Sequence, residues 1–190
     1  GTRPFGPAEA ARLREAARCV AAPLAALAAR AALAALLEAY LGRRSAARVQ
    51  AGALRRGTGE TIRAALLCAD LRDFTALSEA TEPVAMIAAL DAWFDRVAGA
   101  VHAFGGEVLK FIGDGVLAIF PVIGAPAEAC EAALRAIVAA RAGMAHLDAV
   151  RQAQGLPPLP FGAALHLGEI LWGNVGAADR LDFTAIGPAV

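Results

Sequence analysis

Residues 107–120 read EVLKFIGDGVLAIF and indicate the fold most clearly. Two runs rich in apolar residues, 107–112 and 116–120, flank the sequence Gly113-Asp114-Gly115. Short runs of this kind, separated by glycine and aspartate, are typical of antiparallel strands joined by a tight turn. The glycines also allow the backbone to approach a ligand closely. We therefore predict a β-hairpin with Asp114 at its tip.

The segments around this hairpin alternate between strand and helix patterns. Upstream, the apolar run 62–69 predicts a buried strand that ends at Asp70. A helix is predicted from Pro83 to Gly105, because proline favours the first helical position and glycine the end. A second long helix is predicted between Pro126 and Gly155. The inward faces of the two helices are predicted to carry Ile87, Leu90, Phe94, Val97 and Val101, and Ala133, Ile137, Ala140, Met144 and Leu147, respectively.

Three further strands are predicted at 161–167, 170–175 and 181–186. The order of elements is then strand, helix, strand, strand, helix, strand, followed by an additional strand pair. This order is the ferredoxin-like βαββαβ pattern of the α+β class, here with an extra C-terminal hairpin.

Two aspartates at strand ends form a candidate site. We expect the first and second strands to lie side by side at the centre of the sheet, which would bring Asp70 near Asp114. Two carboxylates held at one sheet edge suit Mg²⁺ or Mn²⁺. Aspartate at a strand end or in a glycine-rich turn is also common for local reasons. The pattern alone leaves both interpretations open.

The N-terminal 42 residues have a helical pattern. Leu13, Ala17, Val20, Leu24 and Leu27 share one apolar stripe, and the pattern continues to Tyr40. Pro23 predicts a kink or restart. The segment is either a helix packed on its own domain or a dimerising signalling helix. Residues 43–60 contain five arginines and are expected to be a connector.

Composition excludes some classes of function. The net charge is zero and the pI is about 7.0, which gives no argument for a nucleic-acid partner or an acidic membrane surface. The most apolar stretch, 19–29, is too short to span a bilayer, so no membrane segment is expected. The three cysteines are isolated, which predicts a reduced, cytoplasmic protein. Of the eighteen basic residues only Lys110 is a lysine, either by chance or because this position needs a compact ammonium group.

Four segments resemble motifs of the class III adenylate/guanylate cyclases. They are ADLRDFT at 69–75, FGGEVLKFIGDG at 104–115, GEILWGNVG at 168–176 and RLDFTAIG at 180–187. The resemblance covers about residues 60–190. It implies that residues 61–190 are a catalytic domain that converts ATP to cyclic AMP and pyrophosphate in a head-to-tail homodimer. Residues 5–27 resemble the last helix of a sensory domain such as a GAF module, which implies a sensory domain in the parent protein.

The resemblance also assigns roles to residues. Asp70, Asp114 and the carbonyl of Leu71 would bind two divalent cations, Mg²⁺ or Mn²⁺. The backbone amides of Phe74 and Thr75 would hold phosphate oxygens.

Lys110 and Thr184 of the partner protomer would contact adenine, by the same resemblance. An ammonium group suits the N1 acceptor, and a threonine hydroxyl can accept from the 6-amino group. Guanine would call for an acidic residue at position 110. A guanylate cyclase and a catalytically impaired nucleotide-binding or dimerising module are the alternatives.

The sequence departs from the family pattern at two places. Asp73 stands where the family usually has a small residue, often glycine, and it adds negative charge beside the expected triphosphate loop. The sequence ends at Val190, before an asparagine and an arginine that stabilise the transition state in the family. The 190-residue fragment by itself is therefore expected to be inactive or impaired.

Overall fold

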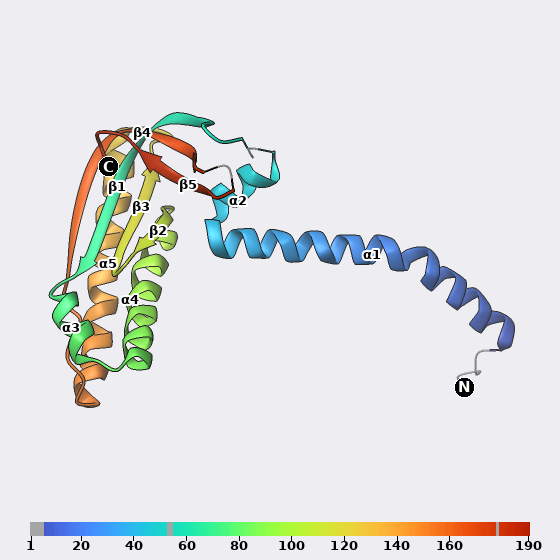
Figure 1. Cartoon of the computed structure of the whole chain (residues 1–190), viewed down its shortest axis with the longest axis horizontal. Helices are drawn as coiled ribbons and strands as arrows, with labels where there is room; N and C mark the ends of the chain where they lie inside the picture. Colours follow the sequence, from blue (N-terminus) through green and yellow to red (C-terminus); the bar gives the residue numbers. More distant parts are fainter. Residues whose placement is uncertain (1–5, 53–54, 178) are drawn as a thin grey trace.

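The computed structural model describes residues 6–52, 55–177 and 179–190. The first five residues of the helical segment and residues 53–54 of the connector lie outside it. A five-stranded antiparallel sheet carries α4 and α5 on one face, and α1 projects from the domain (Figure 1). The elements are α1 (Pro7–Leu41), α2 (Arg43–Gln50), β1 (Gly59–Leu71), α3 (Phe74–Ala80), α4 (Pro83–Ala103), β2 (Glu107–Ile112), β3 (Gly115–Pro121), α5 (Pro126–Ala153), β4 (Phe161–Gly176) and β5 (Leu181–Ile186).

The strand order is β2-β3-β1-β4-β5, which confirms the ferredoxin-like fold with its added strand and corrects one expectation. β1 lies beside β3 and β4, and β2 is an edge strand. The prediction that the first and second strands are neighbours is therefore wrong. The hairpin explains the difference, because β3 returns along β2 and occupies the place between β2 and β1.

β4 is a single strand of 16 residues where two strands were predicted. It pairs with β1 without interruption from Gly59 opposite Gly173 to Leu71 opposite Phe161. Gly168 sits inside this ladder opposite Ala64, so it does not end the strand. Part of the expected connector also forms regular structure, because residues 43–50 are the helix α2.

The buried face of α4 differs from the predicted face. Ile87 is 61% exposed, which contradicts its predicted inward position. Val97 and Val101 are buried as predicted, and Leu90 and Phe94 are half-buried against the core. The helix is rotated so that the large Trp93 points inward and is fully buried. The predicted face of α5 is confirmed, since its members are buried or packed against the same core.

The two faces of the sheet carry two separate cores. Odd-numbered residues of β1, such as Ala65 and Leu67, pack under α4 and α5. Even-numbered residues, such as Leu66, face the other side and pack against the β4–β5 hairpin. β5 thereby comes into contact with β2, although the two strands are the opposite edges of the sheet.

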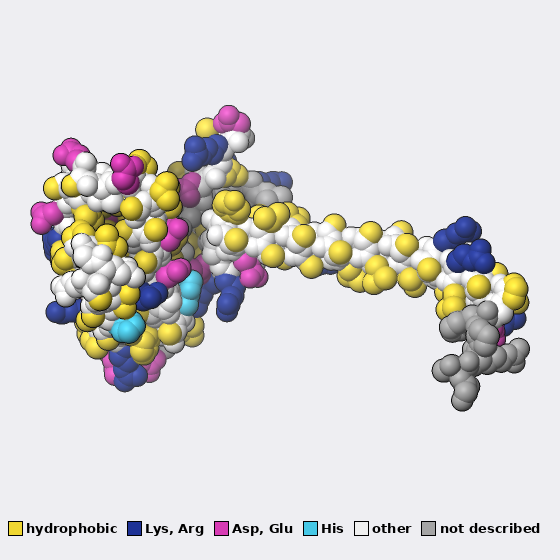
Figure 2. Space-filling view, turned by 90° about the horizontal axis from the view of Figure 1, so that it is seen from below, with side chains coloured by type: hydrophobic (Ala, Val, Ile, Leu, Met, Phe, Trp, Pro, Cys, Tyr) yellow, Lys and Arg dark blue, Asp and Glu magenta, His cyan; other side chains and the backbone are white. Residues whose placement is uncertain are grey.

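Helix α1 continues through Pro23 as one helix that bends in its N-terminal half (Figure 1). None of its residues is buried, and apolar side chains run along its length between arginines (Figure 2). Among the described helices, α1 alone is long and apolar enough to cross a membrane by length and composition. The expectation that the chain has no membrane segment was based on residues 19–29 alone, and it stays a prediction.

Candidate active site

Asp114 is held at the hairpin tip by two contacts. Its carboxylate Oδ2 accepts a hydrogen bond from the backbone N–H of Leu71 at 3.1 Å. Its backbone carbonyl accepts a hydrogen bond from Nε1 of Trp93 at 2.8 Å. Trp93 was not identified from the sequence, although a buried indole N–H generally needs an acceptor. The tip of the hairpin is thereby fixed against the end of β1.

Asp70 lies at the same edge of the sheet. Ala69 pairs with Val116, and this register places the last residues of β1 beside the hairpin tip. Asp70 and Cys68 project from the face opposite α4 and α5. Partial burial, and then the negative charge of Asp70, raise the pKa of the Cys68 thiol. No hydrogen bond or ion pair joins the Asp70 carboxylate to another described residue.

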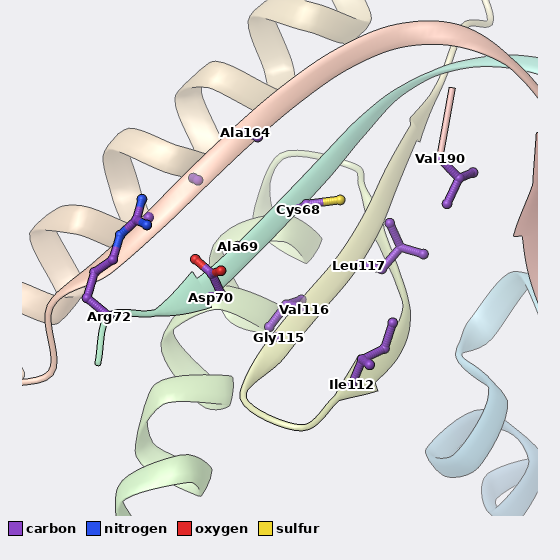
Figure 3. A pocket seen from close by; sticks show the side chains of 12 residues that line it. Cys68, Ala69, Asp70, Arg72, Ile112, Gly115, Val116, Leu117, Ala164 and Val190 are labelled. Atoms are coloured by element: carbon purple, nitrogen blue, oxygen red, sulfur yellow. The ribbon is translucent and has the colours of Figure 1, made fainter. Parts of the chain in front are cut away.

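A pocket of about 440 Å³ opens beside Asp70 on this face (Figure 3). Residues from β1 and its end, the β2–β3 hairpin and the start of β4 line it. Its lining includes Asp70, Arg72, Ile112 and Gly162.

Arg72 was not identified from the sequence as a site residue. Its side chain lies along β4 (Figure 3) against Gly162. A Cβ atom at position 162 would be 2.0 Å from its Nη2 atom, so a side chain there would displace the guanidinium group. The guanidinium group places a positive charge in the pocket that Asp70 lines.

The turn after β1 leads directly into α3. Asp73 precedes this helix with φ 54° and ψ 30°, a left-handed conformation that favours glycine. The Asp73 side chain makes no capping hydrogen bond, and the amides of Phe74 and Thr75 belong to the first helical turn, where intrahelical acceptors are lacking.

The predicted adenine-contacting residues lie at the contact between β2 and β5. The Lys110 ammonium group forms an ion pair with the carboxylate of Asp182. Asp182 and Thr184 are two residues apart on β5 and therefore share a face of the strand. The structure thus brings Lys110 to the strand that carries Thr184. Asp182 was not identified from the sequence as a site residue, although the alternation of side chains along β5 places it on the same side as Thr184.

The carboxylates and the Lys110 group form two separate parts of the surface. Within the described ranges, no hydrogen bond or ion pair connects Lys110 or Thr184 to Asp70 or Asp114. The described residues also contain no group of three or more His, Cys, Asp or Glu side chains suited to a metal. The metal ligands that the resemblance implies are the carboxylates of Asp70 and Asp114 and the carbonyl of Leu71. This set suits Mg²⁺, which commonly binds one or two protein carboxylates and keeps several waters.

Comparisons with known proteins agree with this fold. A family profile described as the adenylate and guanylate cyclase catalytic domain matches residues 59–189. Adenylate cyclase 1 of Rhizobium meliloti (strain 1021) is 33% identical over 121 residues, which are 64% of this chain and 18% of that protein. Adenylate cyclase of Anabaena cylindrica is 31% identical over 138 residues, which are 70% of this chain and 26% of that protein. The chain therefore spans about a fifth to a quarter of the length of these relatives.

A solved structure shows the same likeness. The adenylyl cyclase CyaB from P. aeruginosa superposes with a TM-score of 0.65 and is 30% identical. The superposition covers 70% of this chain and 69% of that one. Because the family profile covers more than half of the chain, the chain belongs to the class III adenylate/guanylate cyclase catalytic domains.

Proposed function

We propose that this chain is the catalytic domain of an adenylate cyclase, which converts ATP to 3′,5′-cyclic AMP and pyrophosphate. The observation that carries the proposal is the arrangement at the end of β1. The Leu71 N–H holds the Asp114 carboxylate beside Asp70, whose own carboxylate is exposed and lacks a partner within the described chain. Bacterial adenylate cyclases among the relatives support the choice of ATP.

Asp70, Asp114 and the Leu71 carbonyl would hold two divalent cations, Mg²⁺ or Mn²⁺. When bound, such ions lower the pKa of the ribose 3′-hydroxyl and offset the charge of the triphosphate. The protein contributes a rigid frame for the carboxylates, because Trp93 and Leu71 fix Asp114 through two hydrogen bonds.

Phosphate oxygens would be bound by groups that follow β1. The first-turn amides of Phe74 and Thr75 are donors without intrahelical acceptors. The guanidinium group of Arg72 adds a cation in the neighbouring pocket. Asp73 disfavours phosphate binding by these groups, because its carboxylate adds negative charge at the start of α3.

Adenine would be recognised by Lys110 and Thr184. Lysine is a donor only, which suits the N1 acceptor of adenine, and the Thr184 hydroxyl can accept from the 6-amino group. The ion pair with Asp182 keeps the Lys110 ammonium group at β5. Guanine carries donors at N1 and N2 and is therefore matched less well by a lysine.

The two parts of the site would meet across a head-to-tail homodimer. Within one chain Lys110 makes no direct contact with the carboxylates of Asp70 and Asp114. A second protomer can therefore supply the adenine-binding residues to the metal-binding residues of the first. Phe111 and Ile112, next to the hairpin tip, are 50% and 62% exposed. Exposed apolar side chains of this kind favour burial in an interface.

The test measures cyclic nucleotides formed by a longer protein that contains this chain, with Mn²⁺ and either ATP or GTP. We expect cyclic AMP from ATP. Cyclic GMP from GTP would instead make the domain a guanylate cyclase. A folded, dimeric protein that forms neither product would be a nucleotide-binding or dimerising module.

A further inference from the structure

Glu107, the first residue of β2, is an acidic side chain buried at the junction with α2. Only 4% of it is exposed. Its Oε1 atom accepts hydrogen bonds from the backbone N–H groups of Arg44 and Ser45, at 3.0 and 3.4 Å. Its Oε2 atom lies 3.5 Å from Nε of Arg44. Because Gly42 at the helix N-cap has no side chain, Glu107 performs the capping role from a distant part of the sequence.

Gly42 is the single residue between α1 and α2. Its φ is 78°, and a Cβ atom there would lie 2.9 Å from Oε1 of Glu107. Glycine at this joint therefore serves both the backbone conformation and the approach of the carboxylate. Helix α1 has no buried residue and its main contacts are with α2, so this joint and α2 are its chief attachment to the domain (Figure 1).

Glu107 also connects α2 to β2, the strand that carries Lys110. Lys110 lies three residues after Glu107, and the same strand leads to Asp114 at the hairpin tip. The ladder between β2 and β3 is irregular between Val108 and Lys110. An irregularity of this kind bends the strand and can re-aim a neighbouring side chain. The position of Glu107 therefore bears on the direction in which the Lys110 side chain points, through the bend that separates them.

The buried position of Glu107 disfavours the charged form of its carboxyl group. Burial raises the pKa of this carboxyl, although its backbone hydrogen bonds and the charges of Arg44 and Arg43 act in the opposite direction. The Oε2 atom has no hydrogen-bond partner among the described residues. Glu107 lines a cavity of about 490 Å³, and the other charged or titratable residues that line it are Glu38, Arg43, Arg44 and His102.

We propose that Glu107 is a positioning residue that couples helix α1 to the adenine-binding strand. Its carboxylate holds the first turn of α2 and, with it, the Gly42 joint, so that the placement of α1 sets the placement of Lys110. The coupling itself concerns the fold of this chain, and its consequence for ATP rests on the proposed function.

The first test uses amide hydrogen exchange in this chain, measured by NMR. Glu107→Ala should speed exchange at Arg44 and Ser45 by about tenfold or more, the equivalent of one lost hydrogen bond. Glu107→Gln keeps an acceptor oxygen and should retain most of the protection. Glu60→Ala is the matched control, because Glu60 binds α2 only through the exposed Arg48 side chain. Equal exchange in Glu107→Ala and Glu60→Ala would overturn the proposal.

The second test asks whether the effect reaches β2. Glu107→Ala and Gly42→Ala should each speed exchange at the amides of Leu109 and Lys110. The double variant should add little, because both changes break the same contact. Additive effects, or a response confined to α2, would contradict the coupling.

A third measurement separates this proposal from the proposed function. In an active longer protein, Glu107→Ala should raise the KM for ATP by about threefold or more and change kcat less, as expected for displaced adenine binding. An unchanged KM would contradict the link to Lys110. A protein that is inactive in every variant would count against the cyclase assignment, while the exchange measurements still decide the coupling.

Discussion

At the scale of single residues, the two aspartates of the candidate site have different roles. Asp114 is part of the fold, since its side chain and backbone bind Leu71 and Trp93. Asp70 is exposed and has no such contact within the described chain. A substitution at Asp70 therefore separates chemistry from stability more cleanly than one at Asp114.

Asp70→Asn should abolish activity without unfolding the protein. We expect cyclic AMP formation to fall by about 100-fold or more, because bound metal contributes several kcal/mol to transition-state stabilisation. The thermal midpoint should stay close to that of the wild type, and Mn²⁺ binding followed by calorimetry should weaken. Asp95→Asn, an exposed change on α4, is the control. Near-wild-type turnover in Asp70→Asn would refute the metal assignment.

Asp73 combines an unfavourable backbone conformation with an unfavourable charge, and two variants separate these effects. Asp73→Gly should stabilise the fold by about 1 kcal/mol, because glycine adopts positive φ without steric cost. Asp73→Ala should not stabilise it, since alanine keeps the strain. Both variants should lower the KM for ATP, because both remove the negative charge beside the phosphate-binding amides. A lower KM only in the glycine variant would assign the effect to backbone geometry.

At the scale of elements, two contacts tie distant parts of the chain together. The Lys110–Asp182 ion pair joins the two edge strands β2 and β5. The Glu107 carboxylate joins β2 to the start of α2. Both contacts involve β2, so this short edge strand is the element that places Lys110, the proposed adenine-binding residue.

Asp182→Asn tests the contact between the edge strands. Because Asp182 is 57% exposed, stability should change by less than about 1 kcal/mol. The KM for ATP should rise, because Lys110 loses the partner that holds it at β5. Glu131→Gln removes an exposed ion pair with Arg135 on α5 and is the control. Equal KM values for the two variants would show that the Lys110–Asp182 pair does not position the lysine.

The raised pKa of Glu107 predicts a dependence of stability on pH. Its folded-state pKa lies above the ordinary value of 4.5, chiefly because burial disfavours the charged form. The stabilisation from this group is therefore complete below about pH 4.5 and is lost as pH rises through the folded-state pKa. Urea unfolding between pH 4 and 6 should show the wild type losing stability relative to Glu107→Gln. The opposite slope would contradict a raised pKa.

At the scale of the whole molecule, the proposed site is divided between two protomers. One chain presents the carboxylates at the end of β1, and the other would present Lys110 and Thr184. The exposed apolar residues Phe111 and Ile112 lie between these parts along the sequence.

Mixing two inactive variants tests this division. Asp70→Asn and Lys110→Ala should each be inactive alone. In an equal mixture, half of the dimers are mixed and each contains one intact site, so about a quarter of the wild-type activity should return. Subunit exchange is verified by mass spectrometry of tagged chains. Verified mixed dimers without activity would exclude sites shared between protomers.

The sequence by itself determined the elements that depend on local chemistry. The hairpin at 107–120 and the starts of α4 and α5 at proline follow from turn residues and apolar runs. The expected approach of Asp70 to Asp114 rested on a strand pairing that the structure does not have, because β3 and not β2 lies beside β1. The fold class followed from the order of these elements. Periodicity misplaced Ile87, because a spacing of three and four residues is compatible with more than one helix face when most positions are apolar or alanine.

Only the tertiary structure decided the contacts between residues far apart in the chain. It placed β3 between β2 and β1, joined the predicted strands 161–167 and 170–175 into β4, and brought β5 to β2. It also identified Trp93, Arg72, Asp182 and Glu107, whose partners lie 21 to 90 residues away along the chain. The physical reason is that local preferences act over a few residues, whereas burial and hydrogen bonding are satisfied in three dimensions.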